Sequence, residues 1–249
     1  MSDFSTWYNS VPTFTRLWFS GTVAVTLLGK LNILPIQYLF LSPELVFKKL
    51  QLWRPMTSLL FYPPSFHFLI NLYLLYSYSS KLEKDHYKTS PSDYFFLLFF
   101  CWICTVLAGF LFNIYFLMDA MVVCVIYIWC QMNKDVIVTF WFGTKFKAVY
   151  LPWVLLVVNF ILSNGHIDSL SGIVVGHLYY FLKYQYPQEH GGVELLKTPA
   201  FLKNYFPDIS GVHGFGIPPA STARPRTTMQ GGNRFFADSW GSGNTLGRN

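Results

Sequence analysis

The stretch Tyr94–Phe112 has the sequence YFFLLFFCWICTVLAGFLF, a run of 19 residues without a charged side chain. A bilayer core about 30 Å thick needs roughly 20 mostly apolar residues in an α-helix, so this stretch can cross a membrane. The rest of the chain has the same character, since 53% of its 249 residues are hydrophobic and only 12% are charged. Soluble domains carry about 25% charged residues. The composition therefore argues against an ordinary soluble enzyme and predicts an all-α integral membrane protein.

Five further apolar runs flank this stretch and meet or approach the length of a span. The six predicted spans are Leu17–Leu34, Phe66–Ser80, Tyr94–Phe112, Ile114–Met132, Val149–Ser163 and Ile167–Tyr184. The second and the fifth are only 15 residues long, about 22 Å of helix at 1.5 Å per residue. We expect such short spans to thin the bilayer or to recruit flanking interfacial residues.

Basic residues near the ends of the spans predict the orientation, because cytoplasmic loops retain Lys and Arg. Three lie on one side of the membrane, Lys48, Lys49 and Arg54. Ten lie on the other side: Arg16, Lys81, Lys84, Lys88, Lys134, Lys145, Lys147, Lys183, Lys197 and Lys203. The distribution predicts that both termini are cytosolic.

Outside the spans, the sequence predicts a helix in the first luminal loop and a C-terminal tail. In the first luminal loop, Ser42-Pro43-Glu44 begins a helix with an N-cap, a proline and an acidic first turn, which we expect to lie in the membrane interface. Residues 1–186 would form the membrane domain and 187–249 a cytosolic tail. The tail can form one short helix after Thr198-Pro199, and beyond Pro207 its Gly, Pro, Ser, Thr and Arg composition is typical of disorder.

Several kinds of site are not expected. The four cysteines all fall in apolar stretches, so we predict neither a disulfide framework nor a metal site, and no cofactor. The net charge of +6 comes from dispersed residues, which argues against nucleic-acid binding. No removable signal peptide is expected at the N-terminus. Asp119 and Asp168 are expected near the luminal boundary, although Asp119 could instead face a wet cavity.

Four local patterns occur in one order along the chain. They are Gln51-Leu52-Trp53-Arg54-Pro55-Met56-Thr57, His67-x3-Asn71, Leu82-Glu83 and Gly172-x3-Gly176-His177. Together they resemble the rhomboid superfamily of intramembrane proteins. The resemblance implies a six-transmembrane-helix, rhomboid-like bundle whose core residues include Trp53, Arg54, Asn71, Glu83, Gly172, Gly176 and His177.

The chain lacks the nucleophile of a rhomboid protease, which would be a serine on span four activated by the histidine of span six. No serine occurs between Ser92 and Ser163, and span four has no Gly-x-Ser. His177 is thus a base without a nucleophile, and we interpret it as a structural polar group of the bundle. No catalytic residue is predicted.

A second set of matches narrows the family. Phe140–Lys147, FWFGTKFK, continues to Tyr150-Leu151-Pro152-Trp153, and Gly214–Pro219 reads GFGIPP. With Ser10-Val11-Pro12 near the N-terminus, these segments are similar to the derlins, rhomboid pseudoproteases of endoplasmic-reticulum-associated degradation. The similarity covers nearly the whole chain.

The last residues carry one further pattern, Trp240–Gly247, with the sequence WGSGNTLG. It resembles the peptide by which derlins recruit the valosin-containing AAA ATPase. Trp240 and Leu246 would fill pockets, while Gly241 and Gly243 would allow close backbone approach by strand addition.

The family resemblance implies a non-catalytic protein of the endoplasmic reticulum membrane that helps misfolded clients to reach the cytosol. It would thin the membrane, recruit the ATPase and work as a homo- or hetero-oligomer with ubiquitin ligase complexes. Two other functions remain open, a transporter or channel for small solutes and an active intramembrane protease.

Overall fold

The computed structural model describes residues 2–140, 143–162, 168–189, 192 and 195–207. All of them belong to the first of two units of the chain, residues 1–210. The predicted ATPase-binding peptide, Trp240, Gly241, Gly243 and Leu246 included, lies outside the described residues.

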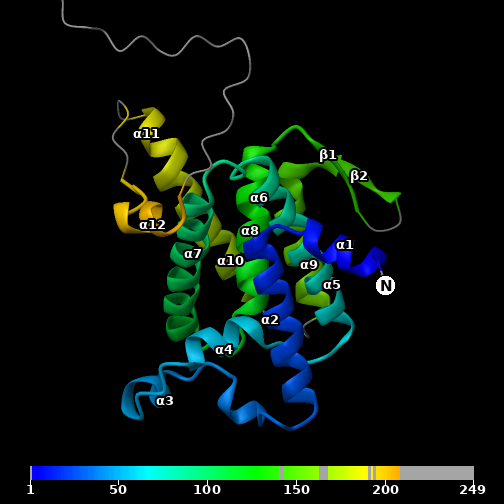
Figure 1. The fold of residues 1–249 in the computed structure, drawn as a ribbon, viewed down its shortest axis with the longest axis vertical. Helices are drawn as coiled ribbons and strands as arrows, with labels where there is room; N and C mark the ends of the chain where they lie inside the picture. Colours follow the sequence, from blue (N-terminus) through cyan, green and yellow to red (C-terminus); the bar gives the residue numbers. More distant parts are fainter. Residues whose placement is uncertain (1, 141–142, 163–167, 190–191, 193–194, 208–249) are drawn as a thin grey trace, which may run out of the picture. The chain divides into compact units, whose positions relative to one another are not determined.

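The described part of the chain is helical, apart from one short hairpin (Figure 1). In chain order, the elements are α1 (Ser2–Ser10), α2 (Thr13–Lys30), η1 (Ile36–Tyr38), α3 (Pro43–Lys48), α4 (Arg54–Leu60), α5 (Phe66–Leu74), η2 (Leu75–Ser79), α6 (Ser80–Asp85), α7 (Pro91–Phe112), α8 (Met118–Met132), β1 (Ile137–Thr139), β2 (Lys145–Lys147), η4 (Ala148–Tyr150), α9 (Leu151–Leu162), α10 (Asp168–Tyr180), η5 (Phe181–Gln185), α11 (Tyr186–Glu189) and α12 (Ala200–Tyr205). The segments η2 and η5 are π-helical, whereas η1 and η4 are 3₁₀ turns.

Helices occupy each of the six positions predicted to span the membrane. Among the described residues, α7 alone is long and apolar enough to cross a bilayer by itself, with 22 residues and a mean hydropathy of 2.5. Shorter apolar helices occur at Met118–Met132 and Ala148–Leu162. The helical fold is therefore confirmed, and the number of spans stays a prediction.

Two helices extend past the apolar runs predicted as spans, and polar contacts are present at each extension. The first predicted span starts at Leu17, but α2 starts at Thr13, where the Glu83 carboxylate accepts hydrogen bonds from its first turn. The second was expected to end at Ser80. It instead runs without a break through α5, η2 and α6 to Asp85, 20 residues in all. This helix is therefore not short.

Helix α8 forms the centre of the bundle, with the other long helices around it (Figure 1). Every residue from Met118 to Cys130 on α8 is buried. Its sequence is apolar all round except for Asp119, as expected for a helix without a solvent face. Both cysteines of α8 are free, as are Cys101 and Cys104 of α7.

Two of the helices outside the predicted spans were predicted. Helix α3 starts at Pro43 after the Ser42 N-cap, and α12 starts at Ala200 and packs against α7. The antiparallel β1–β2 hairpin was not predicted, since its three-residue strands carry too short an alternation to detect; it pairs Val138 with Phe146.

Candidate functional site

A polar network lies inside the bundle around the carboxylate of Asp119, which is 5% exposed. Asn71 Nδ2 and Asn159 Nδ2 donate hydrogen bonds to Asp119 Oδ1 at 3.1 and 2.9 Å. The Ser169 hydroxyl donates to Asp119 Oδ2. A buried carboxylate is tolerated only where donors replace its water. The network therefore ties together α5, α8, α9 and α10.

The surroundings of Asp119 were only partly predicted. Its position near the luminal boundary stays a prediction, whereas the structure shows its carboxylate enclosed among hydrogen-bond donors. The missed partners are Asn159 and Ser169. Their only sequence signal was that they are polar residues at or near the edge of apolar runs, as Asp119 is, and sequence spacing cannot show that three helices bring them together.

His67 extends the network toward the end of the bundle where α5 begins. Its Nε2 lies 3.1 Å from Asn159 Oδ1 and 3.9 Å from Asp119 Oδ1, and its Nδ1 lies 2.8 Å from the Tyr62 hydroxyl. We assign the neutral tautomer with the proton on Nε2, because that atom can then donate to Asn159 while Nδ1 accepts from Tyr62. His67 Nε2 also lies 3.3 Å from Asn71 Nδ2.

This network is not arranged for nucleophilic catalysis. The Ser169 hydroxyl is beside a carboxylate, but Ser169 is 1% exposed, so a substrate cannot reach it. The side chain that α8 brings to His177 is that of Tyr127, a phenol, and no serine lies on this helix. The arrangement instead pairs buried polar groups with one another, although Asn71 Oδ1 has no partner among the described residues. Such pairing holds helices together in a medium without water.

The two predicted glycines lie where α10 crosses α8. A Cβ atom on Gly172 would lie 2.1 Å from the carbonyl oxygen of Ala120, and one on Gly176 would lie 3.0 Å from that of Cys124. Both positions therefore allow the backbones to approach more closely than any side chain would permit. The interpretation of these glycines as packing residues agrees with this geometry.

Glu83 fastens the start of α2 to the end of α6. Its Oε1 accepts from Phe14 N at 3.1 Å, and its Oε2 accepts from Thr15 N at 2.9 Å and from Thr15 Oγ1 at 2.8 Å. The carboxylate also suits the positive end of the helix dipole. Thr15 was not among the predicted site residues.

Arg54 and Trp53 play different roles in the first loop. Arg54 is 2% exposed, donating from Nε to Gln51 Oε1 at 2.6 Å and from NH1 to the Phe40 carbonyl at 2.8 Å. Arg54 thus links two parts of the first loop, through the side-chain oxygen of Gln51 and the backbone oxygen of Phe40. Trp53 is 51% exposed, and the neighbouring apolar side chains Phe47 and Leu52 are 67% and 70% exposed. This exposure fits an interfacial loop.

His177 lies on the outer face of α10. Its side chain is exposed, and its Nδ1 lies 2.8 Å from the Tyr127 hydroxyl. It is therefore a bundle residue with one polar partner, separate from the Asp119 network.

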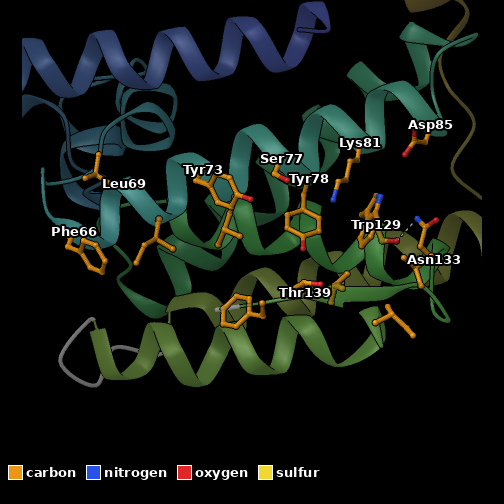
Figure 2. A pocket seen from close by; sticks show the side chains of 16 residues that line it. Phe66, Leu69, Tyr73, Ser77, Tyr78, Lys81, Asp85, Trp129, Asn133 and Thr139 are labelled. Carbon is orange, nitrogen blue, oxygen red and sulfur yellow. Dashed lines mark hydrogen bonds between the residues drawn. The ribbon is translucent and has the colours of Figure 1, made fainter. Parts of the chain in front are cut away.

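A groove of about 920 Å³ runs beside α5, η2 and α6 and is closed on its other side by the end of α8 and the β1 strand (Figure 2). Phe66 lies at one end and Asp85 at the other, a rise of about 28 Å along the helix axis at 1.5 Å per residue. The walls alternate aromatic and polar side chains. They include Tyr73, Ser77, Tyr78, Lys81, Trp129, Asn133 and Thr139.

The groove and the polar network lie on different faces of the same helix. His67 and Asn71 point into the bundle, whereas Leu69 and Tyr73 are 60% and 64% exposed and line the groove. Two residues along a helix turn the side chain by about 200°, which explains the separation. Within the groove, the Lys81 ammonium lies 5.0 Å from the Tyr78 ring and 5.3 Å from the Trp129 ring. The groove was not predicted from the sequence, because its walls come from two distant segments, Phe66–Asp85 and Trp129–Phe140.

Comparison with known proteins gives consistent matches along the chain. A family model described as the Der1-like family matches residues 11–200. The chain is 51% identical to Derlin-1 of Drosophila melanogaster over 99% of this chain and 100% of that protein. It is 46% identical to Derlin-1 of Homo sapiens over 99% of each chain, and 33% identical to a probable derlin-1 homolog of Dictyostelium discoideum over 99% and 100%.

Proposed function

We propose a function from the premise that this chain belongs to the Der1-like family, the derlins: it is a non-catalytic membrane protein of endoplasmic-reticulum-associated degradation. In this role it helps misfolded proteins to pass from the lumen or the membrane to the cytosol. It acts by binding clients and perturbing the membrane, without cleaving them.

The groove beside α5, η2 and α6 is the observation that carries this proposal. Its length of about 28 Å is close to the thickness of a bilayer core, about 30 Å. An extended polypeptide in hydrocarbon loses several kcal/mol for each unsatisfied backbone group. Ser77, Asn133 and Thr139 offer hydrogen bonds along the groove, and its aromatic side chains offer apolar contacts, so a client segment would be better solvated there than in lipid.

Membrane thinning is the second part of the proposal. The helix α8 has 15 residues, about 22 Å, and the apolar segment Ala148–Leu162 has the same length. Spans this short favour a thinner bilayer around them. The helix that ends at Asp85 does not contribute, because it is 20 residues long.

The tail supplies the pulling partner in this proposal. Trp240 and Leu246 would anchor the valosin-containing AAA ATPase, with Gly241 and Gly243 between them. Ubiquitin ligase complexes of the endoplasmic reticulum membrane and further copies of the chain complete the assembly. Replacing Trp240 by alanine should abolish co-purification of the ATPase in mild detergent while membrane insertion is retained, and full retention of the ATPase would show that the peptide is incidental.

Site-specific photo-crosslinking tests the groove. A benzophenone amino acid at Ser77 in the full-length chain should crosslink to a misfolded client whose degradation is stalled. The matched control is Val174 on α10, which is 60% exposed and lies outside the groove. Equal crosslinking from both positions, or none from Ser77, would contradict a client path along the groove.

A further inference from the structure

A basic cavity and an apolar cleft adjoin along the first turns of α2, away from the groove and the Asp119 network. The basic cavity has a volume of about 590 Å³ and is lined by the start of α2, the end of α6 and Tyr205–Pro207. The apolar cleft has a volume of about 330 Å³ and lies between α2, α4 and α7, labelled in Figure 1. Both volumes fall in the range of small-molecule sites, about 300–1,000 Å³.

The two hollows follow one another along α2. Phe14 lines both, and Leu17 and Trp18, one turn further on, line the cleft only. At 1.5 Å per residue, the cleft therefore extends about 5 Å further along α2 than Phe14, the residue that the two hollows share. A molecule with a polar head and an apolar chain can occupy both at once.

The basic cavity carries an excess of positive charge. Arg16, Lys84 and Lys88 line it, together with the acid Glu83. The Glu83 carboxylate is already occupied by the backbone and hydroxyl of Thr15 and by Phe14 N. None of the three cations forms an ion pair within the part of the chain that the structure describes. The cavity is thus complementary to an anion.

The cleft has only apolar walls and an open rim. Every residue that lines it is aliphatic, aromatic or methionine, and Leu17, Met56 and Phe99 on its rim are 64%, 50% and 43% exposed. Trp18 also lines the cleft and is 8% exposed. The cleft is therefore complementary to a hydrocarbon chain.

We propose that this composite site binds one anionic glycerophospholipid of the cytosolic leaflet. Its phosphate and acidic headgroup lie against Arg16, Lys84 and Lys88, and one acyl chain lies in the cleft between α2 and α7. Under the predicted topology the basic cavity is at the cytosolic headgroup level, where anionic lipids attract clustered Lys and Arg. The site is independent of the proposed client path, since it shares no lining residue with the groove.

Lipid retention by the full-length protein tests the proposal. The chain is reconstituted in bilayers of phosphatidylcholine with one fifth phosphatidylserine, extracted gently, and its bound lipids are identified by native mass spectrometry. Wild type should retain phosphatidylserine in preference to phosphatidylcholine. The double variant Lys84→Gln, Lys88→Gln should lose roughly 25-fold in this preference, about fivefold for each lysine. The matched double variant Lys145→Gln, Lys203→Gln changes two exposed lysines outside the cavity and should behave as wild type.

Three results would overturn the proposal. One is an unchanged preference in the Lys84, Lys88 variant. Another is displacement of the retained lipid by millimolar inorganic phosphate, which would make the cavity a site for free phosphate. The third concerns Leu98→Trp, which fills the cleft and should lower the retention of the whole lipid. If this variant retained as much lipid as wild type, the acyl chain would not lie in the cleft.

A photoreactive lipid covers the case in which Leu98→Trp fails to fold. Phosphatidylserine with a diazirine in its acyl chain should label wild-type peptides that contain Phe14–Trp18 or Phe95–Trp102. Labelling confined to α9 or α10 would place the bound chain elsewhere and contradict the proposal.

Discussion

Replacing Gly172 by alanine should separate the two helices that hold the centre of the bundle. The new Cβ would lie 2.1 Å from the Ala120 carbonyl oxygen and 2.9 Å from its carbonyl carbon. An ordinary carbon–oxygen contact is about 3.3 Å, so the α8 and α10 backbones must move apart by about 1.2 Å, the difference of 3.3 and 2.1. Backbone atoms cannot rotate away as the end of a side chain can.

The cost follows from opposing effects. Overpacking of a close-packed core costs about 1–3 kcal/mol, while alanine gains about 0.5–1 kcal/mol over glycine within a helix. Ala120 follows Asp119 directly, and Gly172 lies three residues after Ser169. The shift of the two backbones therefore loosens the hydrogen bond between Asp119 and Ser169. We expect a net loss of about 1–3 kcal/mol in the free energy of unfolding.

A graded series provides the measurement. The free energy of unfolding is compared by titrating sodium dodecyl sulfate into mixed micelles that hold the full-length chain. Gly21→Ala is the control, because its Cβ would meet only Leu60 Cδ2 at 3.4 Å, an ordinary contact. Gly176→Ala, at 3.0 Å from the Cys124 carbonyl oxygen, should fall between the two, and Gly176→Val should lower abundance further. If Gly172→Ala unfolds as readily as Gly21→Ala, the close approach of the helices does not stabilise the bundle.

Three further predictions follow from single contacts. Asp119→Leu leaves the donors that surround the carboxylate without an acceptor. Because each buried donor without an acceptor costs about 1–3 kcal/mol, the variant should have a much lower free energy of unfolding in the same titration. A higher free energy of unfolding would show that the network destabilises the bundle. Glu83→Ala should lower the free energy of unfolding by about 1–2 kcal/mol, because a helix cap is lost. The control is Asp85→Ala, which changes an exposed side chain and should alter stability by less than about 0.5 kcal/mol. Equal effects of the two variants would refute the capping role. Tags at both termini should be digested by protease added to sealed microsomes, and protection of either tag would contradict the predicted topology.

The boundaries of the helices show where sequence patterns stop being sufficient. Apolar runs located α7 well, because both of its ends coincide with a change in composition. The helix that ends at Asp85 continues past its apolar run through a turn that includes Glu83. That extension depends on contacts with the start of α2, about 70 residues earlier in the sequence, and no local pattern encodes such a contact.

The candidate site was predicted in pieces. Arg54, Asn71, Glu83 and Gly172 were each identified from motifs, and each makes a defined contact in the bundle. The partners of Asp119 were not predicted, since an acidic residue near the end of an apolar run does not show which polar side chains surround it. Only the convergence of four elements decides that.

The sequence by itself determined the class of this protein. Long apolar runs without charge require helices in lipid, because the backbone must satisfy its own hydrogen bonds there, and ordered motifs sufficed for the family. The tertiary structure alone decided which polar groups face one another, which helix is central and where the groove, the basic cavity and the cleft lie. The physical reason is that hydropathy depends on residues close in sequence, whereas a buried carboxylate or a hollow depends on side chains that distant helices bring within a few ångströms.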